Sequence, residues 1–400
     1  MIRILILIIY FCTSLIKILS KLHIFTKISA TSKQKNMLIR DIANYLEKFA
    51  PISLQESYDN SGLLIGASTS EVNKILITLD VTEDVIKEAV SKNCDLIIAH
   101  HPIIFNGIKK LTNSNLTEKL VVEAIKSNVA IYAIHTNLDN IIGGVNSILA
   151  KKLGIKNTRI LSPKSGGFKK IICFCPNDYT QIVQKAMFDA GAGMIGNYDT
   201  CSYVSSGTGT YKALEGSNPF IGEKNQLHEE KENRIEVIIP EYLINNAVKA
   251  MKNAHPYEEP AYDIYTLDNT NNMVGSGLIG EIDTETPITE YLKTVKRTLG
   301  SKYIKHNKLI DRPVKRVAIC GGSGSFLIDV AARNKADLFI TGDVKYHDYF
   351  EHTGNMTIAD AGHYETEHPV KELIYALLKE KFPNFALQIS EENANPISFI

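Results

Sequence analysis

Residues 85–101 have the sequence VIKEAVSKNCDLIIAHH, in which a helical pattern leads into a short apolar run that ends on two adjacent histidines. A β-like segment at 74–80 precedes this stretch, so the order β-α-β is predicted. The same order recurs late in the chain, where residues 327–343 follow a β-like segment at 315–320. We therefore expect an α/β protein with two related lobes, although any two α/β units share such a pattern.

Polar side chains stand where three of the apolar runs end. His100 and His101 close the first run, the second leads into HTNLD at 135–139, and the third leads into HYETE at 363–367. Strand ends border the ligand crevice of an open α/β sheet. If the two lobes face each other, Asp343 ends a strand of the second lobe roughly where His100 ends one in the first. A site shared between the lobes is then predicted.

These groups have the chemistry of a metal site. Neighbouring side chains on a strand point to opposite faces, but where the strand opens into a loop two adjacent histidines could each serve a different ion of a pair. Nitrogen and oxygen donors without a thiolate suit Zn, Fe, Mn, Co or Ni. One strand-end histidine alone is more often a hydrogen-bonded structural residue, and the three clusters together favour metal binding. The candidate ligands are His100, His101, Asp139, His363 and Glu367.

The last cluster is predicted to straddle the start of a helix. Thr366 is a typical N-cap residue and Pro369 a typical first-turn residue. His363 is therefore expected in the preceding loop and Glu367 in the first helical turn, from which residues 370–377 continue an apolar helix face. The two side chains are still expected to converge on one site.

Composition bounds the class of protein. Four hundred residues exceed one ordinary core, so two or three structural units are expected. The balance of 44 basic and 44 acidic residues gives no signature of nucleic-acid binding or of attraction to an acidic membrane surface. The six cysteines include no C-x-x-C pair, and four of them lie in apolar strand-like runs. Buried free thiols in a reducing compartment, the cytoplasm, are the natural interpretation.

The first 36 residues do not fit this pattern. Residues 4–16 form a mostly apolar run that is short for a spanning helix and closest in length to the core of a signal peptide, but lysines follow it in place of a cleavage site. Met37 then opens an amphipathic helix at 38–46. We interpret residues 1–36 as a mis-set start, with a signal or membrane anchor as the alternative.

The middle of the chain has its own order of elements. Residues 167–272 are predicted to fold as β-α-β-β-α-β, which is a ferredoxin-like order. A polar segment rich in glycine and asparagine then returns the chain to the main domain. The predicted units are therefore a first lobe at 37–166, the inserted domain, and a second lobe at 273–400.

Several ordered motifs together resemble one family. They are ESYDNSGL at 56–63, His100-His101-Pro102, HTNLD at 135–139, Thr341-Gly342-Asp343 and GHYETE at 362–367. With them, residues 37–400 resemble the NIF-three-like family, whose members are often labelled GTP cyclohydrolase 1 type 2 homologues. Tyr58 stands where the family commonly has tryptophan.

The resemblance has implications for the site and for the assembly. The family's dinuclear metal ligands map onto the same five residues that the strand ends indicate. It also implies a toroidal homohexamer and an inserted PII/CutA-like domain, with residues 193–198 and 255–260 as marks of that domain.

Other motifs leave two interpretations open. Asp59 could be a catalytic group or support a metal ligand, but the stretch is equally a plain turn. His347 is a candidate proton carrier at the pocket rim, or a histidine on a helix face. Gly321-Gly322-Ser323-Gly324-Ser325 follows a strand and precedes a helix, where backbone N–H groups could hold an anion such as phosphate. His255 is expected to be structural.

The leading hypothesis is a metal-dependent hydrolase with two divalent ions per chain. Glu367 or Asp139 is the expected bridge, because a carboxylate can bind two ions at once. The family label suggests attack on the purine ring of GTP, and phosphoester or C–N hydrolysis of another nucleotide-like substrate fits the same ligands. The alternative is a non-enzymatic ring protein that senses a metal or a nucleotide. An open coordination position that faces a pocket would favour the enzyme.

Overall fold

The structure is a computed structural model that describes residues 37–398 and 400. The expectations for residues 1–36, an over-extended start or a signal or anchor, lie outside the described residues. Within the described part of the chain, no helix combines the length and the apolar character needed to cross a membrane.

The first sheet has five strands in the order β1-β4-β3-β2-β15. The four strands from β4 to β15 run parallel, and β1 pairs antiparallel at the edge. Helices cover both faces, which explains why the central strands are continuous apolar runs. The strands are β1 (Gly62–Ile65), β2 (Lys74–Thr78), β3 (Leu96–Ala99), β4 (Ala130–Ala133) and β15 (Ala386–Ile389).

Two pairs of helices cover this sheet. Apolar side chains of α2 (Ile39–Phe49) and α12 (Val370–Lys381) form one core with β2 and β3. Those of α3 (Glu83–Ser91) and α4 (Leu116–Lys126) form a second core on the other face. The amphipathic helix expected after Met37 is thus present.

The second sheet has six strands in the order β11-β14-β13-β12-β10-β5. The three strands β12, β13 and β14 are parallel, and the other pairings are antiparallel. Its core contains residues of α6 (Val145–Lys152) and α9 (Ile288–Leu299) on one side and of α10 (Ile328–Arg333) on the other. The strands are β5 (Ile155–Lys164), β10 (Asn271–Thr286), β11 (Lys305–His306), β12 (Val314–Ser323), β13 (Leu338–Gly342) and β14 (Thr357–Asp360).

Both sheets contain the β-α-β order that the two similar stretches predict. In the first, β2 and β3 are parallel neighbours joined through α3. In the second, β12 and β13 are parallel neighbours joined through α10. His100 directly follows β3, and Asp343 directly follows β13, as expected from the sequence.

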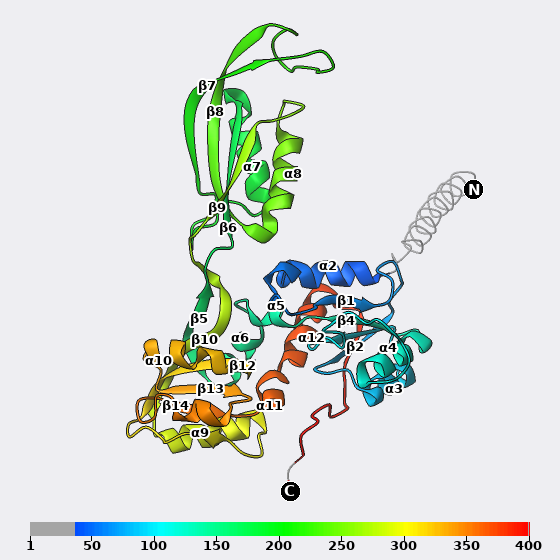
Figure 1. The fold of residues 1–400 in the computed structure, drawn as a ribbon, viewed down its shortest axis with the longest axis vertical. Helices are drawn as coiled ribbons and strands as arrows, with labels where there is room; N and C mark the ends of the chain where they lie inside the picture. Colours follow the sequence, from blue (N-terminus) through cyan, green and yellow to red (C-terminus); the bar gives the residue numbers. More distant parts are fainter. Residues whose placement is uncertain (1–36, 399) are drawn as a thin grey trace, which may run out of the picture.

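A third, four-stranded antiparallel sheet has the order β7-β8-β6-β9 and stands away from the other two (Figure 1). Its elements follow one another as β-α-β-β-α-β, the predicted order. Their bounds are β6 (Phe168–Pro176), α7 (Thr180–Asp189), β7 (Ser202–Lys212), β8 (Leu227–Pro240), α8 (Ile244–Ala254) and β9 (Tyr262–Leu267). The chain enters and leaves it through β5 and β10, where Lys164 pairs with Asn271.

The two larger sheets are joined by the segment after β14. The short helix α11 (His363–Glu367) packs against β12 and β13, and α12 then packs on β2 and β15 of the other sheet. This crossing, shown in orange in Figure 1, brings the carboxyl ends of strands from both sheets to one place. The candidate ligands come from these strand ends. Short 3₁₀ helices complete the fold at Ile52–Leu54, Asn177–Tyr179, Glu241–Leu243, Ser325–Leu327 and Tyr346–Phe350, and the one-turn helix α5 spans Thr136–Asp139.

The prediction for the start of the last helix is wrong in detail. His363 and Glu367 are the first and last residues of α11, and Gly362, with φ +97°, stands at its N-cap. Thr366 lies inside this helix, where its hydroxyl donates to the backbone carbonyls of the preceding turn. Pro369 precedes α12 and is not in its first turn. The helix begins at His363, earlier than predicted, because Gly362 can adopt the positive φ that this start requires. The preference of threonine for N-cap positions, on which the prediction for Thr366 rested, does not indicate this earlier start.

Candidate metal centre

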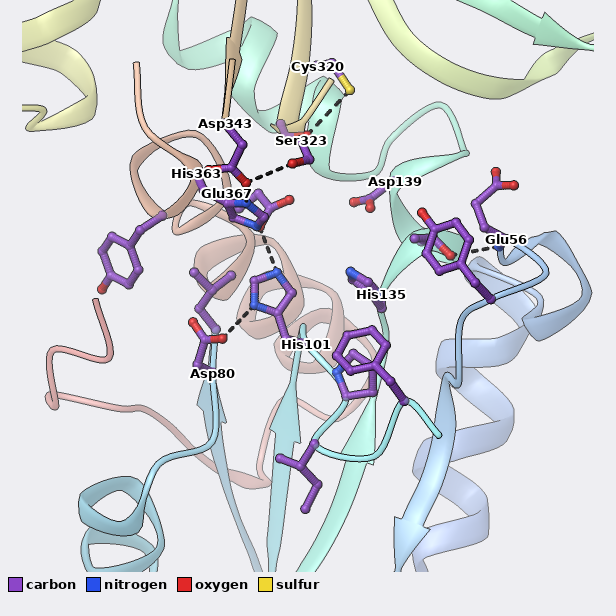
Figure 2. A pocket seen from close by; sticks show the side chains of 18 of the residues that line it. Glu56, Asp80, His101, His135, Asp139, Cys320, Ser323, Asp343, His363 and Glu367 are labelled. Carbon is purple, nitrogen blue, oxygen red and sulfur yellow. Dashed lines mark hydrogen bonds and ion pairs between the residues drawn. The ribbon is translucent and has the colours of Figure 1, made fainter. Parts of the chain in front are cut away.

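The candidate ligands meet at a cavity of about 950 Å³ between the two larger sheets. In Figure 2, His101 points toward His363 and Glu367, which come from the opposite side of the cavity. His101 follows β3, His135 follows β4, and His363 and Glu367 lie on α11. Side chains that are up to 266 residues apart in sequence are therefore in direct contact.

Four histidines share one arrangement: the Nδ1 atom of each ring is hydrogen-bonded to an oxygen outside the centre. Such a partner fixes the proton on Nδ1 and leaves the Nε2 lone pair available for a cation. The acceptors, with their N···O distances, are the Ile134 carbonyl for His100 (2.7 Å), Asp80 for His101 (2.7 Å), Asp59 for His135 (2.8 Å) and Asp343 for His363 (2.6 Å).

The Nε2 atoms and two carboxylates converge. The Nε2 atoms of His101 and His363 each lie 2.9 Å from the same oxygen, Oε2 of Glu367. The Nε2 atom of His100 lies 3.5 Å from Oδ1 of Asp139. Three groups at this centre have ligand atoms within 4.8 Å of one another and could hold a metal ion: His101, His363 and Glu367; His100, Asp139 and Glu367; and His100, His101 and His135.

Each side of the centre contains one short helix with a histidine at its start and a carboxylate at its end. His135 is the N-cap of α5 and Asp139 its last residue, and His363 and Glu367 bound α11 with the same spacing of four. At this spacing two side chains share one face of a helix. Sequence reasoning selected Asp139 and missed His135, although this spacing within HTNLD was a signal that could have found it. It also missed Asp80, which stands two residues after β2.

Two buried atoms of the centre, which lie 3.5 Å from each other, have no hydrogen-bond partner among the described residues. Nε2 of His100 and Oδ1 of Asp139 are both buried, and neither makes a hydrogen bond with the described residues. Buried polar atoms are nearly always satisfied, so a pair left over is evidence for a missing ligand. A cation between a nitrogen and a carboxylate oxygen would satisfy both atoms, so the donor set fits a metal ion.

Cys320 lies at the edge of the cavity but is a poor ligand (Figure 2). Burial raises the pKa of this thiol, and the nearby carboxylates of Asp139 and Glu367 raise it further. The thiol therefore stays protonated, whereas a metal ligand must be a thiolate. The centre is built from nitrogen and oxygen donors, as expected from the sequence.

The histidines have different proton affinities because their surroundings differ. Burial lowers the pKa of His100 to about 3. Burial also acts to lower the pKa of His101 and of His363, but the carboxylates that contact them overcome this and raise these values to about 10 and about 9. Without a cation, protons on these two rings offset the charge of Glu367.

The two carboxylates of the centre shift in opposite directions. Burial opposes the ionised form of Glu367, but the contacts with His101 and His363 hold its pKa well below the usual value. Burial, followed by the charge of Glu367, raises the pKa of Asp139. A cation would replace these protons and leave both carboxylates ionised.

The glycine-rich stretch after β12 makes room for Glu367. A Cβ atom on Gly322, which has φ +63°, would lie 2.0 Å from Oε1 of Glu367. Three of the backbone N–H groups expected to hold an anion already donate to protein side chains. Gly321 donates to Asn146 (2.9 Å), Gly322 to Thr366 (3.0 Å) and Gly324 to Thr341 (2.9 Å). These three N–H groups are therefore not available to a phosphate, and anion binding by the rest of the stretch stays a prediction.

The remaining candidates lie in different places. Asp59 is buried against His135 and Thr136, and although burial acts the other way, these hydrogen bonds hold its pKa well below the usual range. This position agrees with support of a ligand, while a catalytic role for Asp59 stays a prediction. His347 is exposed beside Tyr346 and Phe350 and does not line the cavity, so the structure does not bring it to the centre.

Metal uptake should release protons, because both raised pKa values mean that His101 and His363 are protonated near pH 7. Binding of Zn²⁺ needs their Nε2 atoms and an ionised Asp139, whose pKa is also raised, so titration at pH 7 is expected to release at least two protons per chain. The apparent affinity should therefore rise with pH and level off above about 9 to 10. Calorimetry in buffers of different ionisation enthalpy measures the release. The proton release should be smaller in Asp343→Asn, because Asp343 helps to raise the pKa of His363. If the unaltered protein released no protons, the assignment of protonated His101 and His363 would be contradicted.

Replacing Gly322 by alanine should displace the Glu367 carboxylate and weaken metal binding about tenfold or more. Gly300→Ala is a matched control, because Gly300 has a similar φ of +68° at the end of α9 but its Cβ would meet nothing within 4 Å. Both variants should lose about 1 kcal/mol of stability from backbone strain. Equal metal affinity in the two variants, measured by competition with a chelating dye, would show that Gly322 does not position Glu367.

Known proteins resemble this chain over most of its length. Residues 37–396 match the family model Duf34/NIF3 (NGG1p interacting factor 3). A protein of Halalkalibacterium halodurans named GTP cyclohydrolase 1 type 2 homolog is 38% identical over 364 residues, which cover 90% of this chain and 98% of the relative. A Bacillus subtilis protein of the same name is 36% identical over 368 residues, with 90% and 98% covered.

Solved structures resemble the chain as well. A Bacillus cereus protein related to NIF3 superposes with a TM-score of 0.80 at 38% identity and covers 92% of this chain and 100% of its own. A Staphylococcus aureus protein superposes with a TM-score of 0.72 at 29% identity and with the same coverage. The chain therefore belongs to the Duf34/NIF3 family.

Proposed function

We propose that this protein binds two divalent metal ions per chain and is a metal-dependent hydrolase of a small, nucleotide-like molecule. The observation that carries the proposal is the position of Glu367. It belongs both to the group with His101 and His363 and to the group with His100 and Asp139. Two neighbouring cation positions that share one carboxylate are the arrangement of a dinuclear centre.

The five predicted ligands then divide between the two positions. His101 and His363 would hold one ion, His100 and Asp139 the other, and Glu367 would bridge them. His135, which sequence reasoning did not select, is a further candidate because its Nε2 atom belongs to the group with His100 and His101. The nitrogen and oxygen donors suit Zn, Fe, Mn, Co or Ni.

A pair of divalent ions, when bound, lowers the pKa of a water molecule and polarises the bond under attack. The protein's own contribution is to hold the ligands in place. Asp80, Asp59 and Asp343 orient three of the imidazole rings. The cavity beside the centre has the size of a small-molecule site, so a substrate can reach the ligands from that side.

The name shared by the two curated relatives suggests a cyclohydrolase. The geometry supports hydrolysis at a dinuclear centre, either of a C–N bond in a ring or of a phosphoester. A screen of nucleosides, nucleotides and phosphoesters against metal-loaded protein tests the proposal. No turnover of any of them by protein that holds its metals would favour the alternative, a ring protein that senses a metal or a nucleotide.

We also propose the domain organisation expected from the sequence. Lobes at 37–166 and 273–400 would form one metal-binding domain, and residues 167–272 a ferredoxin-like insert of the PII/CutA-like kind. The strand order β7-β8-β6-β9 and the separate core of the third sheet support the insert. The homohexamer stays a prediction, which light scattering on the purified protein tests.

Replacing Glu367 by glutamine should remove both ions, because the amide cannot bridge them with a negative charge. Metal analysis should fall from about two ions per chain to below one. Glu365→Gln is the matched control, because Glu365 lies on the same helix but turns its carboxylate toward Gly362 and Asn395. Full metal content in Glu367→Gln would contradict the bridging role.

Removal of the proposed insert should leave the metal centre intact, because none of the candidate ligands lies in it. Residues 165–270, which are nearly all of the insert, can be removed for this test, because Lys164 and Asn271 are antiparallel partners roughly 5 Å apart that a short Gly/Ser linker can join. The shortened protein is expected to fold, as judged by circular dichroism, and to bind as much metal as the full chain. A folded protein that had lost its ions would show that the insert orders the ligands.

A further inference from the structure

We infer that the cavity beside the metal centre takes an uncharged ring compound, such as a nucleoside or a free heterocycle, and discriminates against nucleoside triphosphates. The inference rests on the proposed function and narrows its substrate class. Three features of the cavity carry it: its charged side chains, the state of its backbone N–H groups, and the apolar side chains at its rim.

The charge of the cavity is the first feature. No lysine or arginine is present among the described residues that line it. The lining includes five carboxylates, from Glu56, Asp80, Asp139, Asp343 and Glu367. Even two bound divalent ions would therefore leave no positive charge over for a ligand. A triphosphate carries several negative charges and is normally held by arginine, lysine or a metal with spare positive charge.

The backbone does not make up for the missing cations. Free N–H groups in a glycine-rich loop can hold phosphate without basic side chains. Here, the N–H groups of Gly321, Gly322 and Gly324 all donate to side chains of the protein. The N–H of Gly362, at the start of α11, likewise donates to Asp360. These four N–H groups are thus not available to a phosphate.

Apolar side chains form the outer part of the cavity. Tyr58, Phe105, Leu116, Phe326 and Ile397 all line it and are all exposed, Phe105 by 50% and Phe326 by 67%. They come from both lobes and from the C-terminal segment, so they surround the opening from several directions. Exposed apolar groups gathered at a cavity mark a ligand site.

Phe105 has the most direct geometry for contact with a ring. Its own ring meets the imidazole of His135 edge to face, with centroids 5.9 Å apart and an interplanar angle of 82°. A planar ligand held against Phe105 would therefore lie next to the metal ligands. Stacking needs no charge on the ligand, and a desolvated anion at this position would face the carboxylates.

Equilibrium binding to the full chain loaded with Zn²⁺ tests the inference. The probes are guanosine, GTP and inorganic triphosphate, each titrated by calorimetry, with the metal content measured before and after. We expect guanosine to bind at least tenfold more tightly than GTP, and triphosphate not to compete with guanosine. Tighter binding of GTP than of guanosine, competition by triphosphate, or no binding of guanosine would each overturn the inference.

Two variants locate the bound ring. Phe105→Ala should weaken guanosine binding about tenfold, the size expected for loss of one base–aromatic contact. Leu111→Ala is the matched control, because Leu111 is similarly exposed on the same loop but does not line the cavity. Both variants should keep their metal. Equal guanosine affinity in the two would overturn the placement of the ring against Phe105.

The metal measurement separates this inference from the proposed function. A protein that binds no Zn²⁺ would contradict the dinuclear centre itself, whichever probe it prefers. A protein that binds its metals but prefers GTP would contradict only the substrate class.

Discussion

The buried carboxylate of Glu367 is the interaction on which the rest of the centre depends. It is 3% exposed, and one of its oxygens contacts the Nε2 atoms of both His101 and His363. A carboxylate buried without partners is strongly destabilising, so its place in the fold is possible only where positive charge is supplied. His101 comes from the first sheet, while His363 and Glu367 lie on α11 beside the second. The contact of His101 with the negative charge of Glu367 therefore forms only where the two sheets meet.

Several local features follow from this requirement. Gly322 must lack a side chain because the carboxylate occupies that space. Gly362 must adopt a left-handed conformation because α11 has to begin at His363 for the two side chains to share a helix face. Asp80 and Asp343 hold the rings whose Nε2 atoms meet Glu367. The histidines that contact the carboxylate are thus supported by one aspartate on each side of the cavity. Either protons on these histidines or bound cations can balance the negative charge of Glu367.

The separation of tasks within the chain is consistent with this arrangement. All candidate ligands lie on the two larger sheets or on the segments that join them, and the third sheet stands apart with its own core. The metal-facing part of the cavity is acidic and polar, and its rim is apolar. An enzyme that relied on recognition of phosphate would need the opposite balance of charge. The charge of the cavity lining therefore bears on which ligands fit it more directly than the family name does.

The sequence by itself determined the parts of the protein that depend on local pattern. Apolar runs buried on both faces and helices with one apolar face follow from periodicity, so the β-α-β units and the β-α-β-β-α-β order of the middle segment could be predicted. The five candidate ligands could be named from their motifs, but the helical turns that carry Asp139, His363 and Glu367 could not. Tertiary structure alone decided which groups touch. The contact between His101 and Glu367 spans 266 residues, the support of His135 by Asp59 spans 76, and the clash that reserves Gly322 for Glu367 involves an atom 45 positions away. Hydrogen bonds and steric clashes depend on the distance between atoms in three dimensions. The periodicity of residues along the chain gives no information about that distance. For that reason the contact of Asp80 with His101 and the space that Gly322 leaves for Glu367 are decided by the tertiary structure.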